Sequence, residues 1–212
     1  MTVEISAPLF LILLAGMPHG AGDILIARRI FRSNYLQLTL FLITYIIIAA
    51  FIITTWFFLP SFSLIAFLLI SIIHFGLMDT ERTKDLPFRY LRTLIYGSTP
   101  IIIPATFHTA DVTDLFSLLI FENHTLLANY ISSLFPIWFL GCIIFFVSGR
   151  KTLKYQLLEI LVLAIVLAYL PPLWGFVVYF CLVHSSRHTL HLLNSLGPLK
   201  YNDYVLLLVT VV

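Results

Sequence analysis

Three histidines and an arginine stand within eight residues of a strongly apolar segment. They are His184, Arg187, His188 and His191, in the sequence VHSSRHTLHLL. At about 100° per residue of an α-helix, all four fall within an arc of about 100° and therefore share one face. The i, i+4 spacing of His184 and His188 can place two imidazoles on one metal ion. This face of the segment therefore predicts metal binding.

Two further histidines lie in other apolar segments. His19 belongs to GMPHGAGD, in which Pro18 is expected to kink the helix and Asp23 stands four residues later on the same face. A carboxylate in that position can accept the second ring N–H of a metal-bound histidine. His74 belongs to SIIHFGLMD, which ends at Asp79. Ionisable groups within membrane spans are functional candidates by default.

The depths of these histidines agree. His19 lies nine residues before Arg28, His74 eight before Arg82, and His188 twelve before Lys200. At about 1.5 Å per residue, all three lie about 12–18 Å from basic residues that mark one membrane surface. A single metal shared by three spans explains this agreement. An all-imidazole set suits Fe(II), Cu, Zn or Ni; neutral ligands and open coordination positions favour Fe(II), and axial ligation of haem stays open.

The composition predicts the element that must position these side chains, a transmembrane helix. The chain of 212 residues is 60% hydrophobic and only 10% charged, whereas soluble domains carry about 25% charged residues. A net charge of +2 gives no indication of a nucleic-acid partner. We predict an all-α, polytopic transmembrane bundle that forms a single domain over 1–212. Its eight apolar segments are 5–27, 35–59, 61–79, 90–107, 130–148, 155–171, 173–194 and 203–212.

Two features of this pattern concern the segment ends. Pro171-Pro172 must break the long apolar run from Leu157 to Leu193. The last segment is too short to cross a bilayer. We therefore expect about seven spans and a truncated eighth, in a chain that is incomplete at its C-terminus.

The loop charges predict the orientation. Outside the apolar segment with Arg187, basic residues occur only in alternate loops, and the positive-inside rule makes these loops cytoplasmic and the N-terminus external. The basic residues of these loops are Arg28, Arg29, Arg32, Arg82, Lys84, Arg89, Arg92, Arg150, Lys151, Lys154 and Lys200. The segment 115–121 is too short to span and is expected to be interfacial or re-entrant. His108 and His124, in or beside the acidic loop with Asp111, are expected to be solvated surface residues.

Four motifs together resemble, in order and spacing, those of the Brp/Blh family of membrane β-carotene 15,15′-dioxygenases. The motifs are GMPHGAGD, SIIHFGLMD, IPATFHTADVTDLF and LPPLWGFVVYFCLVHSSRHTLHLL. The resemblance covers about residues 14–195 and implies a multi-pass protein of the cell membrane. It implies cleavage of β-carotene by O2 into two molecules of all-trans-retinal, and a functional link to a retinal-binding rhodopsin.

The resemblance also implies the roles of particular residues. Four histidines match the positions that ligate the catalytic Fe(II): His19, His74, His184 and His188. Four polar residues match supporting positions: Asp23, Asp79, Glu159 and Arg187. His108 matches a recurrent position, whereas His191 is not required by the pattern. We expect an aromatic-lined path for the polyene, with Phe75, Trp174, Phe176, Tyr179 and Phe180 as candidates, although simple packing is the better interpretation for each one alone.

Three other functions fit some of the same residues. A di-iron membrane desaturase or hydroxylase would use a histidine box such as HSSRHTLH, but it needs about eight histidines in several clusters. The apolar segments of this chain hold one cluster and two single histidines, His19 and His74, which counts against this function. A transporter or proton-relay protein would use the same histidines and carboxylates without a stoichiometric metal. A b-type cytochrome subunit would bind haem between facing helices.

Overall fold

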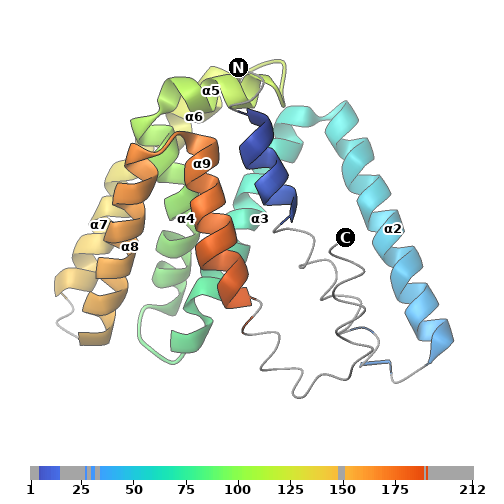
Figure 1. Cartoon of the computed structure of the whole chain (residues 1–212), viewed down its shortest axis with the longest axis horizontal. Helices are drawn as coiled ribbons and strands as arrows, with labels where there is room; N and C mark the ends of the chain where they lie inside the picture. Colours follow the sequence, from blue (N-terminus) through green and yellow to red (C-terminus); the bar gives the residue numbers. More distant parts are fainter. Residues whose placement is uncertain are drawn as a thin grey trace. The chain divides into compact units, whose positions relative to one another are not determined.

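The computed structural model describes residues 5–14, 27, 30–31, 34–147, 151–188 and 190 (Figure 1). Within these residues every regular element is a helix, which confirms the all-α prediction. The chain divides into two compact units, Met1–Phe58 with Phe180–Val212, and Leu59–Tyr179. The predicted segment 203–212 and most of the predicted first span lie outside the described residues.

The first unit contains the helix Ile5–Leu14 and the longer α2, Tyr35–Phe58. The side chain of Asn34 accepts a hydrogen bond from the backbone N–H of Gln37 at 3.2 Å, as a helix N-cap does. None of the residues of α2 is buried. Its 24 residues exceed the roughly 20 that a bilayer span requires, so lipid is the environment that suits this surface.

The second unit consists of consecutive helices. They are α3 (Pro60–Thr80), the 3-10 turn η1 (Glu81–Thr83), α4 (Arg89–Phe107), α5 (Thr109–Ser117), α6 (His124–Ser133), α7 (Phe135–Val147), α8 (Lys151–Tyr169), α9 (Pro172–Val177) and the start of the π-helix η2 (Val178–His184). Helix α4 contacts α3, α6, α7, α8 and α9 and is the centre of this unit.

Three helical stretches in the described part of the chain are long and apolar enough to cross a membrane: Tyr35–Phe58, Pro60–Thr83 and His124–Val147. The last joins α6 to α7 through a turn at Leu134. Pro136 explains that turn, because it has no N–H to continue the helix. The structure therefore supports a membrane protein, while the seven spans and the external N-terminus remain predictions.

Helices α3 and α4 cross with their backbones in contact. A Cβ added to Gly97 would lie 1.7 Å from the carbonyl oxygen of Ile72, and a Cβ added to Gly76 would lie 1.9 Å from that of Thr93. Neither distance can be relieved by a rotamer change, because the opposing atoms are backbone. Small residues at such crossings allow the close approach that stabilises helix pairs in membranes.

Arg92, one of the basic residues that predict the cytoplasmic side, is buried within the protein. Its side chain is fully buried. Its guanidinium donates to the carbonyls of Pro87, Leu86 and Thr83 at 3.1, 3.1 and 2.6 Å, and to the side chains of Thr83 and Gln156 at 2.6 and 3.3 Å. These neutral oxygens accept hydrogen bonds from all the N–H groups of the Arg92 guanidinium. Arg92 thus holds the loop after α3 against α4 and α8.

We predict that Gly97→Ala destabilises the protein by about 3 kcal/mol or more, because the added methyl collides with backbone. The matched control is Gly141→Ala, whose Cβ would meet side-chain atoms alone, the nearest being the end of Ile95 at 2.4 Å. Thermal unfolding in detergent measures both variants. Equal melting temperatures for the two would contradict the backbone contact between α3 and α4.

We predict that Arg92→Lys lowers the free energy of unfolding by about 3 kcal/mol, since a single ammonium leaves several buried carbonyls without donors. Arg89→Lys is the control, because Arg89 is exposed at the start of α4. Denaturation of the purified variants should show a lower free energy of unfolding for Arg92→Lys than for Arg89→Lys. Comparable stability of the two variants would show that the Arg92 network contributes little.

Candidate metal centre

The helix that leads to the histidine pair begins at the predicted proline break. Helix α8 ends at Tyr169, Pro171 adopts an extended conformation (φ −52°, ψ 145°), and α9 begins with Pro172. Proline is favoured at the first position of a helix because that N–H has no intrahelical partner. The break predicted at Pro171-Pro172 is therefore confirmed.

Beyond α9 the helix is not regular. Residues Val178–His184 form a π-helix, and α-helical geometry resumes over residues 185–188. The uniform α-helix expected over 173–194 is therefore wrong in its middle. π-Helical turns are rare and frequently occur at functional sites. This one ends on His184, the first residue of the predicted metal-binding pair.

His184 and His188 are neighbours, as their i, i+4 spacing predicts. Their ring centroids lie 6.5 Å apart with an interplanar angle of 34°. The ring of Phe180 stacks on His184 at a centroid distance of 6.0 Å. His184 is fully buried, and His188 is partly exposed.

The separation of the two rings is one that a shared metal ion would allow. Two imidazoles whose nitrogens lie about 2.0–2.1 Å from one ion have ring centres roughly 4–6.5 Å apart. The observed separation of 6.5 Å lies at the upper end of that range. Among the described residues, no three metal-binding side chains gather at one place, so any further ligands are a matter for proposal.

The other predicted ligands cannot be compared with this pair. His19, Asp23 and His191 lie outside the described residues. His74, exposed on α3, belongs to the second unit, whereas His184 and His188 belong to the first. The four-histidine set therefore stays a prediction.

The three predicted supporting residues that the structure describes, Asp79, Glu159 and Arg187, occupy partly buried positions. Glu159 lies on α8, and Arg187 follows the π-helix. Asp79 lies near the end of α3, where its Oδ2 accepts a hydrogen bond from the hydroxyl of Tyr179 at 2.8 Å. This bond joins residues one hundred positions apart. Both residues are candidates from the sequence, but no local pattern marks them as partners.

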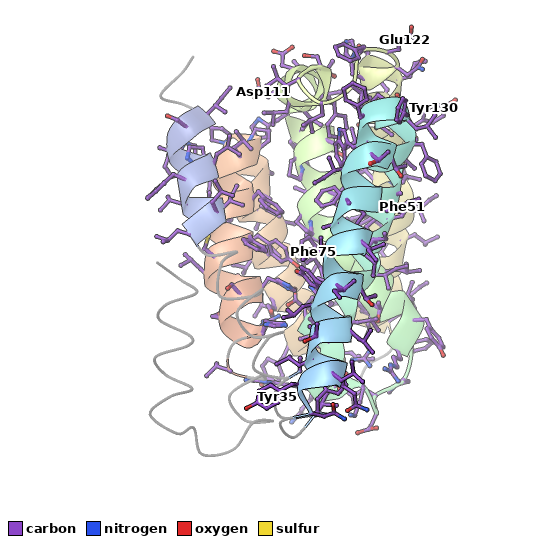
Figure 2. The ribbon with its side chains drawn as sticks, turned by 90° about the vertical axis from the view of Figure 1, so that its right-hand side faces the viewer. Tyr35, Phe51, Phe75, Asp111, Glu122 and Tyr130 are labelled. Carbon is purple, nitrogen blue, oxygen red and sulfur yellow. The ribbon has the colours of Figure 1, made fainter. Side chains whose placement is uncertain are left out.

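The aromatic residues proposed for a substrate path behave partly as packing residues. Phe75 is 6% exposed, and Tyr179 is fully buried. Their rings meet edge to face at 5.3 Å, and Phe75 also contacts Phe176 at 6.3 Å. Figure 2 shows Phe75 partway along the helices of its unit. Packing is therefore the correct interpretation for Phe75 and Tyr179, whereas Trp174 remains 38% exposed.

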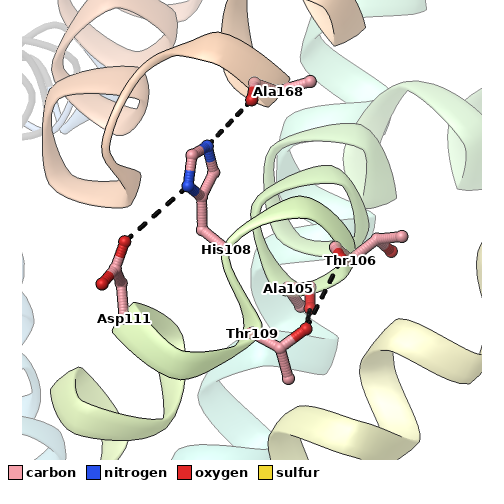
Figure 3. A network of polar contacts seen from close by, with 6 residues as sticks. All are labelled: Ala105, Thr106, His108, Thr109, Asp111 and Ala168. Carbon is pink, nitrogen blue, oxygen red and sulfur yellow. Dashed lines mark hydrogen bonds and ion pairs between the residues drawn. The ribbon is translucent and has the colours of Figure 1, made fainter.

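His108 corrects a second expectation, because it is not a solvated surface residue. Its side chain is 21% exposed, and Nε2 lies 2.9 Å from the carbonyl oxygen of Ala168 (Figure 3). Asp111 lies 3.7 Å from Nδ1. His124, the other histidine of this region, is partly buried at the first position of α6. The proline pair indicates helix carbonyls in need of donors, but no sequence signal identifies His108, sixty residues away, as the donor.

Known proteins share this sequence pattern. A family model described as beta-carotene 15,15'-dioxygenase matches residues 10–207. A relative named beta-carotene 15,15'-dioxygenase, from the uncultured marine bacterium 66A03, is 32% identical over 183 residues, which cover 85% of this chain. The aligned region is 66% of that relative, so the chain spans about two thirds of its length.

No solved structure matches the chain. The family model nevertheless covers nearly the whole sequence and includes all four predicted histidine ligands. The chain belongs to the beta-carotene 15,15'-dioxygenase family.

Proposed function

We propose that this protein cleaves β-carotene at its central 15,15′ double bond. The match to the family model over residues 10–207 carries this proposal, and the adjacent His184 and His188 rings support it. Dioxygen is the co-substrate: the C=C bond breaks, each of its carbons receives one oxygen atom, and two molecules of all-trans-retinal form. The atoms of β-carotene and O2 are then fully accounted for. Family membership favours this reaction over transport, di-iron hydroxylation or haem binding.

Fe(II) is the proposed cofactor, with His19, His74, His184 and His188 as its ligands. Four neutral imidazoles leave coordination positions open and suit divalent iron. When bound, the iron would supply the activation of dioxygen. The contribution of the chain is to fix the imidazoles, orient the polyene and exclude water.

We propose Asp79 as a supporting residue, and its bond to Tyr179 is the observation that favours this role. Tyr179 is fully buried and donates to the Asp79 carboxylate at 2.8 Å. Hydrogen bonds to a charged acceptor are about twice as strong as neutral ones. The carboxylate therefore has a defined orientation one to two turns after His74 on α3. We propose Asp23, Glu159 and Arg187 as further polar support on family grounds.

The proposed location is the cell membrane, with several spans and an external N-terminus. β-Carotene is an apolar polyene, so it would enter laterally from the lipid rather than from water. Asp111 and Glu122 lie at one end of the second unit (Figure 2), as residues of external loops would. A retinal-binding rhodopsin would use the product, because an aldehyde condenses with a lysine amine.

The direct test is expression of the chain in cells that accumulate β-carotene, followed by pigment analysis. We expect loss of carotene with accumulation of retinal. His184→Ala and His188→Ala should each lower the rate at least a hundredfold and reduce the iron content of the purified protein. His124→Ala, at the start of α6, is the control and should match the wild type. Iron-loaded wild-type protein that leaves β-carotene intact would refute the proposed function.

The role of Asp79 is tested through its partner. Tyr179→Phe removes one hydroxyl from a buried ring and should lower activity about tenfold, in the range found when partners of metal-site residues are lost. Tyr130→Phe makes the same chemical change at a position 71% exposed and should have no effect. Retinal formation and iron content are the measurements. Wild-type activity in Tyr179→Phe would exclude a supporting role for this bond.

A further inference from the structure

At the corner between α8 and α9, the last carbonyl groups of α8 cannot find N–H donors within the helix. In a continuing helix the carbonyls of Leu167 and Ala168 would accept from the N–H groups of residues 171 and 172. Both of those residues are prolines and have no N–H. The last regular bond of α8 runs from the N–H of Leu170 to the carbonyl of Val166. The carbonyl of Ala168 therefore needs a donor from elsewhere.

His108 supplies that donor from a distant part of the sequence. Its Nε2 lies 2.9 Å from the Ala168 oxygen, across sixty residues. Because a carbonyl oxygen only accepts, Nε2 must carry the hydrogen. Nδ1 then faces Asp111 at 3.7 Å, which is too long for a hydrogen bond. The direct hydrogen bond of the ring is therefore the one to Ala168, and the contact with Asp111 is a longer, charge-dependent one (Figure 3).

The backbone on both sides of His108 is fixed. Its own N–H donates to the carbonyl of Pro104, and its carbonyl accepts from the N–H of Val112. The hydroxyl of Thr109 donates to the carbonyl of Ala105 at 2.7 Å (Figure 3). His108 therefore stands at a rigid junction between α4 and α5, from which its ring can define the position of the corner.

The corner matters because α9 is short. It has six residues, Pro172–Val177, and the chain continues from it directly into the π-helix that ends on His184. At Gly175 an added Cβ would lie 3.0 Å from Leu167, so α9 packs closely on α8. α9 also packs against α4, and its Phe176 contacts the ring of Phe75 at 6.3 Å. The corner at the start of α9 is therefore one of several contacts that set its direction.

We propose that His108 is a positioning residue: through the Ala168 carbonyl it fixes the corner from which the helix bearing His184 and His188 begins. The role rests on the proposed function. It requires a donor at the place of Nε2 and nothing else from the imidazole. Glutamine can place an amide N–H there, whereas asparagine is shorter and reaches only the place of Nδ1.

The experiment compares His108→Ala, His108→Gln and His108→Asn in the whole chain. In His108→Ala we expect kcat to fall about tenfold to a hundredfold, the effect of a small misplacement of reacting groups, with KM and iron content unchanged. His108→Gln should recover most of kcat and His108→Asn should not. Asp111→Asn, whose side chain is 60% exposed, should retain wild-type kcat.

A second measurement does not depend on activity. Hydrogen exchange of the amides of residues 173–177 should be faster in His108→Ala and His108→Asn than in the wild type or His108→Gln. If His108→Ala does not fold, the comparison of kcat and exchange rates between His108→Gln and His108→Asn tests the proposal. Equal kcat in Gln and Asn variants, or wild-type kcat in the Ala variant, would overturn the proposal. If the wild type does not cleave β-carotene, the proposed function fails, and the exchange rates still decide whether His108 holds the corner.

Discussion

The constraint on which this structure depends is that polar groups in an apolar environment must find partners within the protein. No water is available in a bilayer core to satisfy a free N–H or C=O. In the α2 helix, the hydroxyls of Thr54 and Thr55 donate hydrogen bonds to backbone carbonyls one turn earlier, at 2.7 and 2.8 Å. The guanidinium of Arg92 donates hydrogen bonds to five neutral oxygens. The same rule explains why a histidine reaches across sixty residues to one carbonyl at a proline corner.

This constraint separates the structural polar residues from the functional ones. Arg92 and Gln156 satisfy one another and the loop after α3, and nothing in that network requires a ligand. His184 and His188 instead lie side by side at the end of a π-helix, with ring centroids 6.5 Å apart. Family membership, rather than burial alone, is the ground for the proposal that this pair serves the cleavage of a carotenoid.

Elements with strong local patterns could be predicted from the sequence. Features that depend on contacts between distant residues could not. The apolar run at 35–59 became α2 with ends within a residue, and the proline pair ended α8 as expected. The adjacency of His184 and His188 followed from their spacing. The π-helix could not be predicted, because its wider turns arise from local hydrogen bonding and leave little trace in hydrophobic periodicity. The bond between Tyr179 and Asp79 could not be predicted either, since no local pattern joins residues on helices one hundred positions apart.

The backbone contact between α3 and α4 bears on the proposed iron site. Because neither Gly76 nor Gly97 leaves room for a side chain, the packing of α4 constrains the rotation of α3 about its own axis. The direction in which His74 leaves α3 therefore depends on α4, a helix that carries none of the proposed ligands. On the proposed ligand set, natural variation along α4 would alter how the site holds its metal while every proposed histidine stays the same.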